Sequence, residues 1–180
     1  MHSALAFGPG SVITVKERNL MNSDQKARVN SAAPDFVIRD GNGEKWRLSD
    51  HRGKVIVLLF YPGDETPICT KQMCSVRDRW EDYMATGAEV VGISTDSVES
   101  HKNFAQHHSL PLRLLSDSDG AVSKLYGARS LLPGKVARSV FVIDAKGILR
   151  HRDVRLLGLI KPKDDDTISA IKAAQAEQSK

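Results

Sequence analysis

The hydrophobic pattern of this 180-residue chain centres on two apolar runs, VIVLLFYP at 55–62 and AEVVGIS at 88–94. Most of their positions are apolar in succession rather than alternating with polar residues. A strand that is apolar on both sides is typical of the middle of a sheet whose two faces are covered. Both runs are therefore predicted to be central strands.

Two pairs of shorter strands are each joined by a turn signal. DFVIRD and EKWRLSD flank the tripeptide Gly-Asn-Gly at 41–43, and Asn-Gly favours a two-residue hairpin turn. RSVFVID (138–144) and ILRHRDV (148–154) flank a second turn-forming stretch. The chain is therefore predicted to form an N-terminal β-hairpin and a second antiparallel hairpin nearer its end.

Helical patterns fill the intervals between these strands. They are predicted over about 67–85, 98–108 and 120–127, with LRLLSD (112–117) between the last two. The last helix, at 164–178, begins with three aspartates, which suit the positive end of a helix dipole. This order of elements predicts an α/β fold with a mixed central sheet flanked by helices.

The domain organisation follows from the same pattern. Residues 1–30 are polar and weakly patterned, and we expect them to form a flexible N-terminal extension. Residues 31–180 are predicted to form a single domain, since a chain of this length can bury one hydrophobic core.

Composition excludes several classes of protein. The chain is 41% hydrophobic and 27% charged with a net charge of +4, and its basic residues form no stripe with interleaved aromatics, so nucleic-acid binding is not expected. The longest apolar run is too short to span a membrane. The first residues lack the basic region of a secretory signal, so we expect a cytoplasmic location. Cysteines in that reducing compartment are more often catalytic or metal-binding than structural.

The chain has two cysteines, both in the segment TPICTKQMCS, and the helix predicted there places them differently. Thr66 is a good N-cap and Pro67 falls at the first helical position, which proline favours. Cys69 is then the third helical residue, where free N–H groups and the helix dipole stabilise a thiolate. Cys69 lies on an apolar stripe with Met73, whereas Cys74 lies about 140° away on a polar face.

Spacing alone leaves three interpretations of the cysteines open. Cys69 fits a small core residue, although the polar surroundings of Cys74 do not. A metal site would need more ligands, and no histidine lies near either cysteine in the sequence. The histidines at 101, 107 and 108 lie on another predicted helix and are expected to face solvent. A redox pair is the third interpretation, without the C-x-x-C spacing of thioredoxins.

The segment YPGDETPICTKQMCSVRD resembles the active-site segment of peroxiredoxins, which carry the pattern P-x-x-x-T-x-x-C. Pro62, Thr66 and Cys69 fill that pattern in register. A second cysteine at position 74, followed by Arg-Asp, is similar to the Q-type (bacterioferritin-comigratory-protein-like) subfamily. The likeness extends over about residues 31–178.

This resemblance implies a thioredoxin-like fold and a role for each of five residues. Cys69 would be the peroxidatic cysteine, and Cys74 the resolving cysteine that forms an intramolecular disulfide with it. Arg138 matches the arginine of the family's active site; without the resemblance it reads as a charge at the end of a strand. Thr66 would donate a hydrogen bond to the peroxide in addition to capping the helix. Pro62 would shield the thiolate from water.

The resemblance also implies the substrate and partners. These are hydrogen peroxide or organic hydroperoxides, and thioredoxin or a similar dithiol as reductant, with no cofactor and no metal. The subfamily is often monomeric, and we expect a monomer. Ile68 stands where the subfamily commonly has glycine, which bears on access to the pocket. The alternatives are a general thiol-disulfide oxidoreductase and a non-catalytic metal-binding module.

Helix geometry constrains how the two cysteines can react. Residues five apart in an intact α-helix have Cα atoms about 8.6 Å apart, and a disulfide needs them within about 7 Å. A bond between Cys69 and Cys74 therefore requires the helix to unwind. We expect residues from about 66 to 77 to be helical when reduced and rearranged when oxidised.

Overall fold

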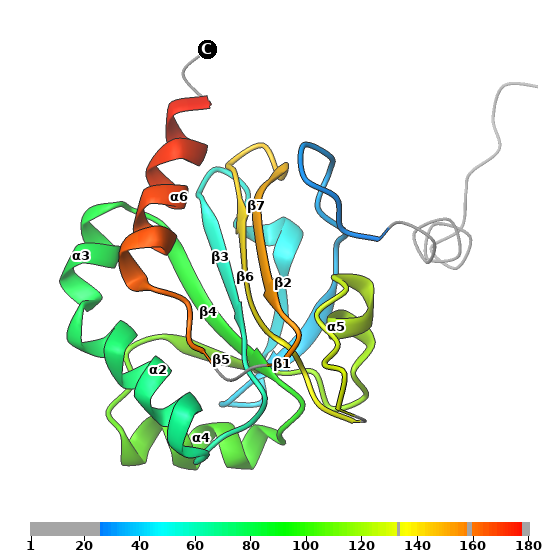
Figure 1. Ribbon diagram of the computed structural model, residues 1–180, viewed down its shortest axis with the longest axis vertical. Helices are drawn as coiled ribbons and strands as arrows, with labels where there is room; N and C mark the ends of the chain where they lie inside the picture. The colour runs from blue at the N-terminus through cyan, green and yellow to red at the C-terminus, as the bar shows by residue number, and fades with distance from the viewer. Residues whose placement is uncertain (1–25, 133, 158–159, 178–180) are drawn as a thin grey trace, which may run out of the picture.

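A seven-stranded mixed sheet forms the centre of the computed structural model, which describes residues 26–132, 134–157 and 160–177 (Figure 1). The strand order is β2-β1-β5-β4-β3-β6-β7. The strands are β1 (Val37–Asp40), β2 (Lys45–Arg47), β3 (Ile56–Phe60), β4 (Glu89–Ser94), β5 (Arg113–Ser116), β6 (Arg138–Ile143) and β7 (Leu149–Arg155). The helices are η1 (Leu48–His51), α2 (Pro67–Asp78), α3 (Trp80–Ala85), α4 (Val98–His107), α5 (Ala121–Leu125) and α6 (Asp164–Ala176). The predicted α/β architecture is confirmed.

The two long apolar runs are the central strands β3 and β4, as predicted. All five residues of β3 are buried, because β3 pairs in parallel with β4 on one side and antiparallel with β6 on the other. Its side chains alternate between two cores: Val57 and Leu59 face one, and Ile56 and Leu58 face the other. Full burial on both faces is the reason for the continuous apolar run.

Each face of the sheet has its own cover (Figure 1). Helices α2, α3, α4 and α6 pack on one face, where their buried residues include Met73, Tyr83, Phe104 and Ile171. On the other face, α5 and the β1–β2 hairpin contribute residues such as Trp46 to a second apolar cluster. The helix that carries both cysteines therefore belongs to the four-helix side.

Both predicted hairpins are present, but the first turn is longer than Asn-Gly predicts. Three residues, 41–43, lie between Asp40 and Glu44, the last hydrogen-bonded pair of the hairpin. The Asp40 N–H donates to the Glu44 carbonyl, and the Gly43 N–H donates to the Asp40 carbonyl. The Asp40 carboxylate also accepts from the N–H groups of Asn42 and Glu44. Gly43 has φ +82°, the left-handed conformation that glycine adopts without strain. The aspartate therefore selects the wider turn.

The predicted helix over 67–85 is wrong in one respect, because it is broken in two. Arg79 has φ −110° and ψ 20°, outside helical values, and separates α2 from α3. Its side chain pairs with Asp82 in α3 and with Asp165 in α6. The turn directs Tyr83 toward α6, where its hydroxyl donates to Asp164. Tertiary contacts with α6 thus accompany a break that the apolar stripe alone did not indicate.

Most of the expected N-terminal extension, residues 1–25, lies outside the described residues. The part that is described packs on the domain: Ala27 is buried, and its N–H donates to the Leu125 carbonyl. The Asn30 N–H donates to the Leu149 carbonyl. Residues 26–30, which the sequence grouped with the extension, therefore contact the domain. None of the helices in the described ranges is long and apolar enough to cross a membrane.

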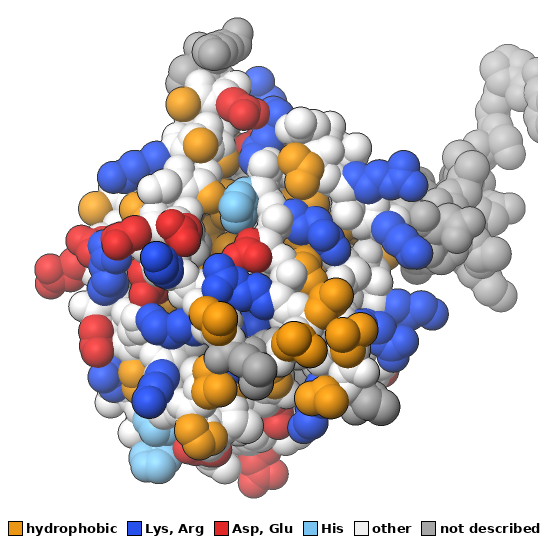
Figure 2. Space-filling model, viewed as in Figure 1, with side chains coloured by type: hydrophobic (Ala, Val, Ile, Leu, Met, Phe, Trp, Pro, Cys, Tyr) orange, Lys and Arg blue, Asp and Glu red, His pale blue; other side chains and the backbone are white. Residues whose placement is uncertain are grey.

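Several large apolar side chains are exposed to solvent. Figure 2 shows hydrophobic side chains gathered in the lower centre of one face. Among the described residues, the five most exposed large apolar side chains are those of Leu131, Leu132, Leu156, Leu157 and Ile160. The chain next to Ile160 contacts α2 directly, since the Lys161 Nζ donates to the Ser75 hydroxyl over 2.7 Å.

Candidate active site

Cys69 is the third residue of α2, as predicted. Pro67 is the first helical residue, and the Thr70 N–H donates to the Thr66 carbonyl as the first helical hydrogen bond. Thr66 is at the N-cap position with extended backbone, but its side chain accepts no capping hydrogen bond. Its hydroxyl instead donates to the Gly63 carbonyl over 3.2 Å. The predicted cap position is confirmed, and the predicted cap hydrogen bond is wrong.

The two cysteines occupy different environments, as the helical stripe predicted. Both are free; Cys69 is fully buried and Cys74 is partly exposed. Cys69 belongs to the apolar cluster that also contains Met73 and Val76 of α2. Both lie within one continuous helix, so their Cα atoms are about 8.6 Å apart by helix geometry. Cys69 is therefore part of the apolar core, and this position is compatible with a chemical role.

Arg138 is the group that contacts the Cys69 sulfur. The register of β3 with β6 pairs Phe60 with Ser139, so Arg138 lies at the end of β3 from which the chain continues to α2. The Arg138 side chain is only 2% exposed, and its Nη2 donates to Cys69 Sγ over 3.4 Å. An interpretation as a surface charge is thereby wrong. The guanidinium is therefore placed to interact with charge that develops on the sulfur or on an atom bound to it.

Gln72 is a site residue that the sequence analysis missed. Its Oε1 accepts a short hydrogen bond from Arg138 Nη1, and the side chain is buried. Gln72 follows Cys69 by three positions, so the two share one side of α2. The signal that could have identified Gln72 is its position, as a polar residue, next to the apolar stripe of the predicted helix. Gln72 orients the guanidinium that contacts the sulfur.

The loop between β3 and α2 is held by a buried polar network around Asp64. Its carboxylate accepts hydrogen bonds from the Tyr61 hydroxyl (2.7 Å), the Ser100 hydroxyl (2.7 Å) and His101 Nδ1 (2.9 Å). The Asp64 N–H donates to the Asp96 carboxylate. These contacts fix the loop that leads to Cys69 against the start of α4.

His101 is fully buried, so the expectation that it faces solvent is wrong. One ring nitrogen faces the Asp64 carboxylate, and the other, Nε2, lies 3.1 Å from the Leu115 carbonyl oxygen. The carboxylate and the carbonyl oxygen both accept hydrogen bonds, so each ring nitrogen of His101 faces an acceptor. The pairing, which the sequence could not show, allows a histidine to occupy the interior.

Burial and hydrogen bonding shift two pKa values in this network. Burial raises the pKa of Tyr61 well above its usual range, and the charge of Asp64 adds to the shift. Burial also acts to raise the pKa of Asp64, but hydrogen bonds from His101 and Ser100 outweigh it. The pKa of Asp64 therefore lies below its usual value, and the carboxylate is charged at neutral pH.

The remaining predicted residues lie in the loop before α2 and in the first turn of that helix. Pro62 is half-buried between the buried residues Tyr61 and Gly63. Thr66 and Ile68 are exposed, so the residues around the buried Cys69 reach solvent. In the described part of the chain, one trio could hold a metal ion: Glu65, His107 and His108. His107 is exposed as expected, but the His108 side chain is only 19% exposed.

The fold and site define a thioredoxin-like protein with a buried cysteine at a helix start beside an arginine. Residues 29–152 match the AhpC/TSA family. The chloroplastic peroxiredoxin Q of Triticum aestivum is 46% identical over 127 residues, covering 70% of this chain and 58% of the relative. That of Sedum lineare is 46% identical over 126 residues, covering 69% and 68%. The chain belongs to the AhpC/TSA family, among the Q-type peroxiredoxins.

Solved structures agree with this family. Peroxidoxin BcpB from Mycobacterium tuberculosis has a TM-score of 0.72 at 31% identity, covering 82% of this chain and 97% of that one. A reduced 2-Cys peroxiredoxin from Plasmodium vivax has a TM-score of 0.75 at 24% identity, covering 84% and 83%, and shows likeness of fold alone. The predicted thioredoxin-like fold is confirmed. The chain spans about three fifths of the length of the wheat relative.

Proposed function

We propose that this protein is a thiol-dependent peroxidase that reduces hydrogen peroxide and organic hydroperoxides. The observation that carries the proposal is the contact between the Arg138 guanidinium and the buried Cys69 sulfur at the start of α2. Membership of the AhpC/TSA family and the similarity to proteins named peroxiredoxin Q support it.

In the first step, the Cys69 thiolate attacks one oxygen of the peroxide. A sulfur–oxygen bond forms as the oxygen–oxygen bond breaks, and the leaving oxygen takes a proton and departs as water or an alcohol. Cys69 is oxidised to a sulfenic acid. The Cys74 thiolate then attacks this sulfur and forms an intramolecular disulfide, while the sulfur–oxygen bond breaks and the hydroxide that leaves takes a proton to become water. A dithiol such as thioredoxin reduces that disulfide and returns both thiols.

A lowered thiol pKa alone is too small an effect to produce an efficient peroxidase. For a generic thiol at pH 7, a fall in pKa from about 8.5 to about 6 raises the thiolate fraction about 30-fold. With a Brønsted slope of about 0.45, nucleophilicity falls about 13-fold over the same range. The net gain is only about two- to threefold, so most of the acceleration must come from elsewhere.

Stabilisation of the stretched oxygen–oxygen bond is the larger effect in this proposal. Arg138 presents several N–H donors in a fixed plane, and Gln72 holds one of its nitrogens. N–H groups at the start of α2 and the Thr66 hydroxyl would donate to the two oxygens as charge develops. Thr66 must first release the Gly63 carbonyl, which accepts its hydrogen in this structure. Pro62 would keep water from the thiolate.

The proposal keeps the partners expected from the resemblance. These are a peroxide substrate, thioredoxin or a similar dithiol, and a monomeric enzyme in the cytoplasm, whereas the plant relatives named above are chloroplastic. Nothing in the reaction requires a bound cofactor, because the electrons come from the two thiols.

Counting thiols after one equivalent of peroxide tests the proposal. Reduced protein should lose both free thiols within seconds, and thioredoxin with its reductase should restore them. The Cys69→Ser variant is the control and should keep its remaining thiol. Slow thiol loss together with fast reduction of a protein disulfide would instead support a general thiol-disulfide oxidoreductase and overturn the peroxidase.

A further inference from the structure

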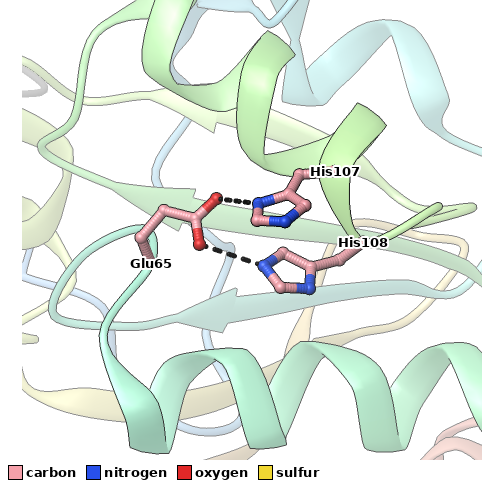
Figure 3. Close-up of side chains that lie close together, drawn as sticks. All are labelled: Glu65, His107 and His108. Carbon is pink, nitrogen blue, oxygen red and sulfur yellow. Dashed lines mark hydrogen bonds and ion pairs between the residues drawn. The ribbon is translucent and has the colours of Figure 1, made fainter.

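Glu65, His107 and His108 form a cluster beside the loop that leads to α2. Figure 3 shows the Glu65 side chain pointing toward both imidazole rings at the end of α4. The distances from the carboxylate oxygens to His107 Nδ1 and to His108 Nε2 are both 3.0 Å. Glu65 lies 42 positions before His107 and 43 positions before His108, so these contacts join the loop before α2 to the end of α4.

The donor atoms suit a divalent transition metal. Imidazole nitrogen and carboxylate oxygen are ligands of Zn²⁺, and sites with two histidines and one glutamate leave a fourth position for water. Metal–ligand bonds of about 2.0–2.1 Å place ligand atoms about 3.3 Å apart around a tetrahedral ion. The three candidate atoms already lie within 4.8 Å of one another, and the exposed His107 can move to close the remaining gap.

Two of the ligands are held in place by neighbours. The His108 ring packs edge-on against Phe104 with centroids 5.0 Å apart, and Arg77 Nη1 donates to the His108 carbonyl over 2.8 Å. Glu65 has φ +55°, a conformation that a residue with a side chain adopts at a cost. The backbone around both residues therefore presents its side chains to a common point.

We propose that Glu65, His107 and His108 bind one divalent transition-metal ion of the Zn²⁺ type, which fastens the loop before α2 to the end of α4. Water completes the coordination. Without metal, each ring N–H donates to one carboxylate oxygen. Ligation needs the lone pair of the same nitrogen, so each proton leaves it for the other ring nitrogen or for solvent.

The position of the site gives it a consequence for the cysteine chemistry. Glu65 directly precedes the N-cap residue Thr66 and lies four positions before Cys69. An ion bound there would oppose unwinding of the first turn of α2. Metal would therefore slow disulfide formation, a consequence that rests on the proposed peroxidase function, whereas the binding site itself does not.

Metal titration of the full-length protein tests the site. The background is the Cys69→Ser/Cys74→Ser double variant, which removes thiolate as a competing ligand. Calorimetry should show one Zn²⁺ bound per chain, and Co²⁺ should give the strong visible absorption of a four-coordinate ion. Glu65→Gln and His108→Gln should each weaken Zn²⁺ binding by at least about tenfold. His51→Gln is the matched control, because His51 belongs to a different histidine–glutamate pair, with Glu89, and its loss should leave binding unchanged.

Hydrogen exchange tests whether metal binding at this site stabilises the start of α2. In wild-type reduced protein, Zn²⁺ should slow amide exchange over residues 65–69, and Glu65→Gln should remove that effect. No saturable binding, or equal binding by Glu65→Gln, His108→Gln and the parent, would overturn the site. Binding of one Zn²⁺ by the parent protein that is lost in those variants would support the metal site even if the protein consumes no peroxide. A failure of the proposed peroxidase function is therefore distinguishable from a failure of the metal site.

Discussion

Arg138 donates a hydrogen bond from Nη2 to the Cys69 Sγ over 3.4 Å, across 69 positions of the sequence. The contact joins the first residue of β6 to the first turn of α2. It exists because β6 runs antiparallel to β3 and so begins where β3 ends. Both side chains are buried, so the charge of the guanidinium is little screened by solvent at the sulfur.

Replacing Cys69 by serine should abolish peroxide turnover, because a serine hydroxyl is not ionised at neutral pH and cannot take the oxygen. We expect less than a tenth of the wild-type rate in a coupled thioredoxin assay. The circular dichroism spectrum should be unchanged, which separates lost chemistry from lost folding. A variant with a tenth of the activity or more would contradict the assignment of Cys69.

Replacing Cys74 by serine should leave the first reaction with peroxide intact and stop recycling by thioredoxin. Cys74 is partly exposed on a different side of α2, away from the contact between Arg138 and Cys69. Without a resolving thiol, excess peroxide should carry Cys69 from sulfenic to sulfinic acid. Mass spectrometry should detect two added oxygen atoms on Cys69. Finding none would argue against Cys74 as the resolving residue.

Replacing Arg138 by lysine should lower the second-order rate with peroxide by at least about tenfold. Lysine keeps the charge and loses the planar set of donors. Stopped-flow rates across pH, divided by the thiolate fraction measured in the same variant, isolate this effect. Arg155→Lys is the control, because Arg155 lies opposite Arg138 on β7 and pairs with Asp153. If the corrected rate equals that of the wild type, the arginine acts only by ionising the thiol.

Oxidation to the disulfide should remove protection from amide exchange over residues 69–77. The two cysteines cannot bond within an intact helix, so α2 must unwind. Unwinding must also release the far end of α2, where the Ser75 hydroxyl donates to Asp164 over 2.6 Å and Arg77 holds the His108 carbonyl. Strand β3 should keep its protection in both forms. Equal protection of residues 69–77 in the reduced and disulfide forms would rule out the rearrangement.

Replacing Asp64 by asparagine should reduce the loss of stability in acid. The folded-state pKa of Asp64 is lowered, so its contribution is full above the unfolded value of about 4 and is lost as pH falls below it. The variant should be less stable at pH 7 by about 3 kcal/mol, because His101 loses its buried partner. Urea unfolding from pH 7 to pH 2 measures both effects. Asp50→Asn, at an exposed position, should keep the wild-type slope; an equally steep slope in Asp64→Asn would contradict the prediction.

The sequence determined most of the elements, although not the break between α2 and α3, and it determined the local placement of Cys69. Continuous apolar runs marked β3 and β4, because strands buried on both faces need apolar side chains at every position. Proline after threonine fixed where α2 begins, and helical periodicity then separated the environments of Cys69 and Cys74. These properties depend on neighbours a few positions apart, so a local pattern records them.

Only the tertiary structure decided which distant groups meet. Nothing local indicated that Gln72 would hold Arg138, that His101 would be buried against Asp64, or that Glu65 would reach two histidines at the end of α4. Each contact depends on how helices pack over the sheet and on the path of the β3–α2 loop. A polar residue tolerates burial when its partner is present, and that partner lies far away along the chain.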